Sequence, residues 1–165
     1  MKKVFLFVTG FIFSCCAAAK SVSNPSDYFR SASTGLWGTL TTWESSPDNT
    51  IWLAATLIPD NGANTIYIRN THSVTVSTNQ NMDQVIIESG GILFHSANTL
   101  TVSDGVGYDI NILAGGIFTL ASTVNPVVFA VSTATVNIST TAILRVAATG
   151  LTFASPNPGD RKSVV

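Results

Sequence analysis

The stretch Val85-Ile86-Ile87-Glu88-Ser89-Gly90-Gly91-Ile92 recurs, at an offset of 25, as Ile110-Asn111-Ile112-Leu113-Ala114-Gly115-Gly116-Ile117. Further positions recur at an offset of 26: Ile117 with Ile143, Asn111 with Asn137, and Thr75 with Thr101. Each period has room for three short strands separated by turns rich in Gly, Ser and Asp. A fixed period of this length is typical of one coil of a parallel β-helix.

Apolar residues alternate with polar ones along the same region, which is the period of a half-buried strand. The alternating pairs are Ile66 and Ile68, Val74 and Val76, Val85 and Ile87, Leu100 and Val102, Ile110 and Ile112, and Val136 and Ile138. We therefore predict an all-β fold, a short right-handed parallel β-helix (solenoid) of about three coils of ~25 residues over residues 65–155. An antiparallel β-sandwich, which also places turns about every 8–12 residues, remains the alternative.

Composition excludes several classes of protein. The 165 residues are 45% hydrophobic and only 10% charged, with a net charge of −1 and no basic run, so we expect no nucleic-acid partner. The only two cysteines, Cys15 and Cys16, are adjacent, which excludes a disulfide framework and a cysteine-based zinc site. Low charge suits stacked coils, because like charges in register would repel.

Residues 1–19 have the features of a secretory signal peptide. Lys2 and Lys3 precede an apolar run over residues 4–13, and three alanines, residues 17–19, offer a cleavage site. The apolar run is too short for a membrane span, which needs about 20 residues, so we expect none in the mature chain. The alternative is a lipoprotein signal, with Cys15 acylated. Either signal predicts a secreted or outer-cell-surface protein.

The C-terminal residues 156–165 are interpreted as a truncated end. Residues 160–165, Asp-Arg-Lys-Ser-Val-Val, carry three charges in six positions, whereas residues 125–159 carry only Arg145. One choice of codons for these six residues spells a sequencing-adapter stretch. We therefore expect an artefact at 160–165 and a longer polypeptide from which the remainder is missing.

Residues 20–64 form a different, aromatic and turn-rich region that contains all three tryptophans. The motifs Gly35-Leu36-Trp37-Gly38, Thr42-Trp43-Glu44 and Ile66-Tyr67-Ile68-Arg69-Asn70-Thr71-His72-Ser73-Val74-Thr75-Val76 follow in that order. In this order and spacing the chain resembles the N-terminal β-helical module of large secreted surface proteins exported by the type IX route, and more distantly the eight-glycine extracellular domain. Thr71 stands where the family pattern has glycine. The resemblance implies export and surface attachment or release.

Trp37, Trp43 and Trp52 are the candidate binding residues. Aromatic faces stack on sugar rings, so the three could form a glycan platform. The competing interpretation, which we favour, is an aromatic cap over the N-terminal end of the coil stack. An extracellular glycan or surface component is therefore the partner to consider.

Other polar residues are given structural roles. His72 and His95 are expected at a strand edge and a coil corner, and the segment between Asp104 and Asp109 at an exposed turn rather than a calcium loop. No spacing of carboxylates, histidines or glycines indicates a catalytic site, a metal site or a cofactor. We therefore expect a non-catalytic structural or adhesive module. The alternative is the N-terminal carbohydrate-binding module of a secreted polysaccharide-degrading enzyme.

Overall fold

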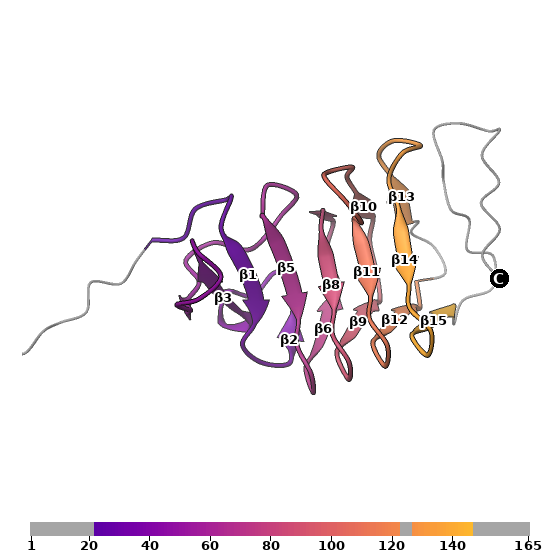
Figure 1. Cartoon of the computed structure of the whole chain (residues 1–165), viewed down its shortest axis with the longest axis horizontal. Coiled ribbons are helices and arrows are strands. Elements are labelled where there is room, and N and C mark those ends of the chain that lie inside the picture. The colour runs from indigo at the N-terminus through magenta and orange to yellow at the C-terminus, as the bar shows by residue number, and fades with distance from the viewer. Residues whose placement is uncertain (1–21, 123–126, 147–165) are drawn as a thin grey trace, which may run out of the picture.

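The computed structural model describes residues 22–122 and 127–146, which form an all-β protein with one short 3-10 helix, η1 (Leu40–Thr42). Within these two ranges fifteen strands form three sheets (Figure 1). Sheet A contains, in spatial order, β14 (Val136–Ile138), β11 (Ile110–Ile112), β8 (Val85–Ile87), β5 (Thr65–Ile68), β1 (Tyr28–Ser31), β3 (Trp43–Ser46) and β4 (Leu53–Ala54). Sheet B contains β15 (Ile143–Val146), β12 (Ile117–Leu120), β9 (Ile92–His95), β6 (Ser73–Val76) and β2 (Gly35–Leu36). Sheet C contains β13 (Val127–Phe129), β10 (Leu100–Val102) and β7 (Gln80–Met82). The predicted signal peptide, 1–19, and the predicted truncated end, 156–165, lie outside the described residues.

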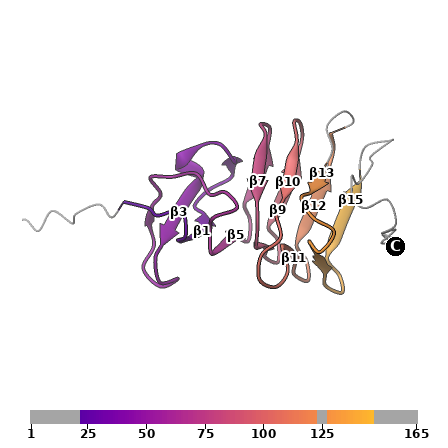
Figure 2. The same ribbon diagram turned by 90° about the horizontal axis from the view of Figure 1, so that it is seen from above.

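Consecutive strands visit the three sheets in turn. The chain runs through β5, β6 and β7, one strand in each sheet, and then returns to sheet A with β8; the same order follows twice more (Figures 1 and 2). Pairing within the described residues is parallel except for β1 with β3 and β3 with β4. The antiparallel sandwich, the alternative left open by the sequence, is therefore not the arrangement of these strands.

The register confirms most of the repeat read from the sequence. Val85 pairs with Ile110, at the offset of 25, and Asn111 pairs with Asn137 and Ile117 with Ile143, each at the offset of 26. The predicted equivalence of Thr75 and Thr101 is wrong. Thr75 lies in sheet B opposite Phe94, whereas Thr101 lies in sheet C opposite Asn81.

The first repeat is also shorter than predicted. Val85 pairs with Ile66 on one side and with Ile110 on the other. Fewer residues separate Val85 from Ile66 than from Ile110, so the first repeat is the shorter one. The reason is that the corners at residues 77–79 and 83–84 are shorter than the matching corners of the next repeat, 96–99 and 103–109.

The core consists of columns of apolar side chains, one residue from each stacked strand. Ile68, Ile87 and Ile112 follow one another in sheet A, and each is fully buried. Polar side chains stack in the same way on the outside, where the Asn137 side chain donates a hydrogen bond of 2.9 Å to Oδ1 of Asn111. Uncharged polar side chains can bond along such a ladder, which explains how the chain tolerates so few charges.

The corner between sheets A and B has the same four-residue form in every repeat. It spans residues 69–72, 88–91, 113–116 and 139–142, and its third residue always has a left-handed backbone. These third residues are Thr71 (φ 67°), Gly90 (φ 76°), Gly115 (φ 79°) and Thr141 (φ 71°). Each of the first three donates its N–H to the carbonyl of the next, over 3.2, 2.9 and 3.3 Å. The corner therefore contributes its own hydrogen-bonded ladder.

Thr71→Gly is expected to raise the free energy of unfolding by about 0.5–1 kcal/mol. A left-handed backbone costs a β-branched residue about 1–2 kcal/mol, and the greater freedom of glycine in the unfolded chain offsets part of that gain. Denaturant titration measures the change. Thr75→Gly is the matched control in the extended strand β6, where the same substitution should destabilise. A loss of stability in Thr71→Gly would contradict the left-handed turn.

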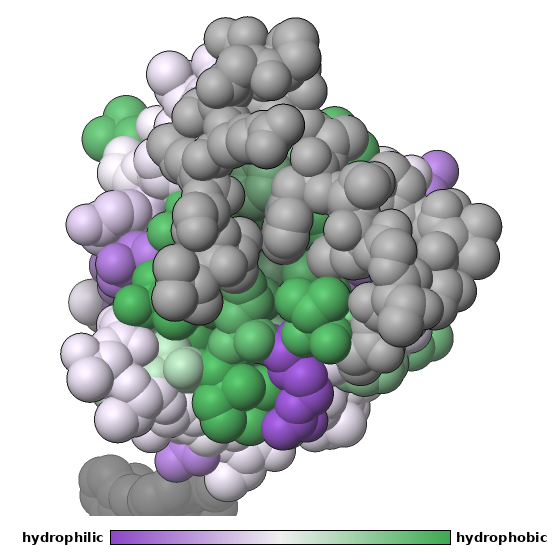
Figure 3. All heavy atoms as spheres, turned by 90° about the vertical axis from the view of Figure 1, so that its right-hand side faces the viewer, coloured by the Kyte–Doolittle hydropathy of each residue, from purple (hydrophilic) through white to green (hydrophobic). Residues whose placement is uncertain are grey.

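The N-terminal region continues the sheets. β1 pairs in parallel with β5, and β2 pairs in parallel with β6, so residues 28–36 begin sheets A and B before the first complete repeat. β3 and β4 then extend sheet A beyond β1. At the opposite end, Figure 3 shows apolar side chains gathered; Val136, Ile138, Ile143 and Val146 of β14 and β15 are 36–46% exposed.

No helix in the described ranges is long and apolar enough to cross a membrane.

Candidate functional site

The structure separates the three tryptophans into a buried pair and a surface residue. Trp37 and Trp43 are 0% and 1% exposed, and their rings meet edge to face with centroids 4.9 Å apart. The Trp37 indole N–H donates to the Pro59 carbonyl at 2.9 Å, and that of Trp43 donates to the Trp37 carbonyl at 2.7 Å. Neither ring has a free face for a sugar, so the three residues do not share one exposed platform.

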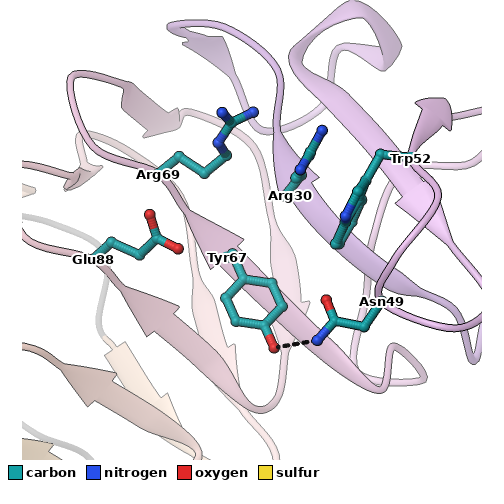
Figure 4. A pocket seen from close by; sticks show the side chains of 6 residues that line it. All are labelled: Arg30, Asn49, Trp52, Tyr67, Arg69 and Glu88. Atoms are coloured by element: carbon teal, nitrogen blue, oxygen red, sulfur yellow. Dashed lines mark hydrogen bonds between the residues drawn. The ribbon is translucent and has the colours of Figure 1, made fainter.

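Trp52 is half-buried and lines an open pocket of about 230 Å³ on the outer side of sheet A (Figure 4). The lining residues are Arg30, Asn49, Trp52, Tyr67, Arg69 and Glu88. Arg30 comes from β1 and Tyr67 from the adjacent β5, while Arg69 and Glu88 begin successive corners between sheets A and B. The parallel pairing of β1, β5 and β8 thus assembles a site from residues that are distant in the sequence.

The two arginines of this pocket share one carboxylate. Nε of Arg30 lies 2.7 Å from Oε2 of Glu44, the residue opposite it on β3, and Nη1 of Arg69 lies 3.9 Å from the same oxygen. The Arg30 guanidinium also lies over the Trp52 ring, 4.3 Å from its centroid, in a cation–π contact. Trp52 in turn meets Tyr67 edge to face at 6.4 Å.

A tight turn places Asn49 at the rim of the pocket. The Asp48 carboxylate accepts hydrogen bonds from the backbone N–H of Thr50 and Ile51 and from the Ser46 hydroxyl. Hydrogen bonds from Thr50, and then from Ile51 and Ser46, hold the pKa of Asp48 well below its usual range. Asn49 takes a left-handed backbone there (φ 60°) and donates its side-chain N–H to the Tyr67 hydroxyl at 3.3 Å.

The histidines occupy two different environments. His72 lies just before β6, with Nδ1 2.9 Å from the Ser31 hydroxyl and 3.0 Å from the Ser31 carbonyl. His95 ends β9 and is fully buried; its Nε2 donates to the Asn98 carbonyl at 2.7 Å, while Nδ1 has no partner among the described residues. The two rings do not share a site.

The expected exposed turn between Asp104 and Asp109 needs one correction. Asp104 is exposed, but Asp109 is fully buried, and its carboxylate accepts the backbone N–H groups of both Gly105 and Thr135 and so joins two repeats. The nearby Asp83 carboxyl has its pKa raised to about 6. The largest cause is the burial of Asp83, and the hydrogen bond with Asp109 and the repulsion from the Asp109 carboxylate add to it. Across the two described ranges no three His, Cys, Asp or Glu side chains gather in a way that could hold a metal ion.

Sequence reasoning did not find the pocket, although one signal pointed to it. Arg30 and Arg69 are the only Lys or Arg residues between positions 22 and 122, and the structure brings both to the same surface beside Trp52.

Comparison with protein-family models, curated proteins and solved structures finds no match to this chain.

Proposed function

We propose that this chain is a non-catalytic, right-handed parallel β-helix module with a structural or adhesive role in a secreted or outer-surface protein. The observation that carries this proposal is the in-register stacking of equivalent strands in three parallel sheets. A path that visits the three sheets in turn advances by one strand spacing per repeat, about 4.8 Å, and buries one continuous core. Such a path gives a solenoid that presents a rigid outer face.

The N-terminal sequence supports a setting outside the cell. The two lysines, the short apolar run and the three alanines favour export, and the type IX family resemblance favours a surface location. A small, disulfide-free stack with few charges can form in that compartment because its stability comes from backbone hydrogen bonds and packed apolar columns.

Expression of the full chain in a Gram-negative host tests the proposal. We expect the product outside the cytoplasm, with Lys20 as its N-terminal residue by sequencing and mass, and no rise in reducing ends when it is incubated with polysaccharides. The variant Lys2→Glu/Lys3→Glu is the control, because loss of the positive start should retain the chain in the cytoplasm. Retention of Met1 in the unaltered chain, or release of sugar products, would contradict the proposal.

A further inference from the structure

We propose that the pocket formed by Arg30, Asn49, Trp52, Tyr67, Arg69 and Glu88, hereafter the arginine pocket, binds a uronic-acid residue of an extracellular polysaccharide. This inference rests on the adhesive role proposed above, and it names the site and the chemistry of the ligand. The ligand is one pyranose ring that carries a carboxylate.

The aromatic residues supply a surface for a sugar ring. Tyr67 and Trp52 stand nearly perpendicular, at 83°, and form a corner (Figure 4). Arg30 already covers one face of Trp52, which leaves the half-buried ring of Tyr67 as the floor. A pyranose ring can lay its C–H face on such a ring while its hydroxyl groups point outward to polar side chains.

The charges supply the preference for a carboxylate. Glu44 is close enough to neutralise the charge of Arg30. It neutralises the charge of Arg69 only in part, because the Arg69 guanidinium lies 3.9 Å from the same oxygen. The Arg69 side chain is 41% exposed and makes no hydrogen bond through its guanidinium within the described residues. A guanidinium with free donors binds a carboxylate through two parallel N–H···O bonds, more strongly than it binds a neutral acceptor.

The remaining polar residues suit sugar hydroxyl groups. Asn49 is fixed by its turn and by its bond to Tyr67, so its amide oxygen faces a ligand at little entropic cost. Glu88 accepts one long hydrogen bond, 3.4 Å, from the backbone N–H of Asn70. Figure 4 shows its carboxylate on the side of Tyr67 away from Trp52, where it can accept a hydroxyl without facing Arg30.

The size of the pocket limits the ligand to a single ring. Its volume of about 230 Å³ is below the range of roughly 300–1,000 Å³ that is usual for clefts that enclose drug-sized ligands. One ring should therefore bind weakly, with a Kd of about 1 mM, and a short oligomer that offers one ring at a time to this single pocket should bind with a similar Kd.

A matched pair of ligands tests whether the arginine pocket recognises the carboxylate of the sugar. Isothermal titration of the full chain with tri-galacturonate should give a Kd of about 1 mM, and the methyl ester of the same trimer should bind at least about tenfold more weakly. The ester keeps the rings and hydroxyl groups and removes only the charge. Equal binding of the acid and the ester, or no binding of the acid, would overturn the proposal.

Matched variants test the site. Arg69→Gln should weaken binding of the acid about tenfold, whereas Arg145→Gln, on the exposed strand β15 of sheet B, should leave it unchanged. Glu88→Gln should strengthen binding of the acid, since the substitution removes a negative charge near the ligand but keeps a hydrogen-bond acceptor. Thermal unfolding of each variant checks that it folds. An unchanged affinity in Arg69→Gln would overturn the assignment of the site, and the export result would be unaffected by that outcome.

Discussion

Trp37→Ala is expected to lower the free energy of unfolding by about 3–5 kcal/mol. The side chain is fully buried, packs edge to face on Trp43 and donates to the Pro59 carbonyl, so truncation leaves both a cavity and an unpaired carbonyl. Trp37 directly follows β2 and Trp43 begins β3, so both residues lie before the first complete repeat. Denaturant titration of the full chain measures the loss, and Trp43→Ala should show a similar one.

Trp52→Ala is the control for that experiment. It removes the same side chain from a half-buried position, where the principal losses are the contact with Arg30 and part of the packing on Tyr67. We expect a cost of about 1 kcal/mol. If Trp52→Ala cost as much as Trp37→Ala, the division into a buried pair and a surface residue would be wrong.

Ile87→Asn is the second substitution with a large expected effect, about 4 kcal/mol of lost stability. Ile87 is fully buried in the column that Ile68 and Ile112 continue, so the change removes apolar contacts and buries an amide that has no partner there. Chemical denaturation followed by intrinsic fluorescence measures the difference from the unaltered chain.

The neighbouring residue provides a matched control within the same strand. Ile86 points outward and is half-buried, and its partner in the next repeat is Asn111, so Ile86→Asn should change stability by less than about 1 kcal/mol. A shift of the strand by one residue would exchange the two faces of β8. The reverse order of effects would therefore show that the register is wrong.

Sequence periodicity predicted six of the strands because an apolar side chain recurs at every second position in each of them. Five of the six alternating pairs are fully buried. The exception, Val136 and Ile138, is 36–41% exposed because no described strand follows β14 in sheet A. The error at Thr75 and Thr101 has a different cause. Both lie in an apolar-Thr-Val tripeptide, and one such tripeptide looks the same whether it lies in sheet B or sheet C.

The site could not be predicted in the same way. The two tryptophans of the buried pair and Trp52 occur in similar turn-rich sequence, and no periodicity there distinguishes an inward from an outward ring. Arg30 and Arg69 are far apart in the sequence and become neighbours only through the pairing of β1 with β5. Their proximity depends on the pairing of β1 with β5, and β1 lies before the first complete repeat. The repeat in the sequence therefore could not predict that the two arginines are neighbours.

The two kinds of corner differ in how much their length varies. The corner between sheets A and B is constrained in length, whereas the corner between sheets C and A is adaptable. From β5 onward the corner between sheets A and B keeps four residues in each described repeat, while the corner that leads from sheet C back to sheet A spans residues 83–84, 103–109 and 130–135. Length differences of several residues are thus absorbed at the corner between sheets C and A without disturbing strand alignment. Peptide epitopes or extra loops grafted at 103–109 should be accommodated, whereas a single inserted residue at 88–91 would displace every later strand.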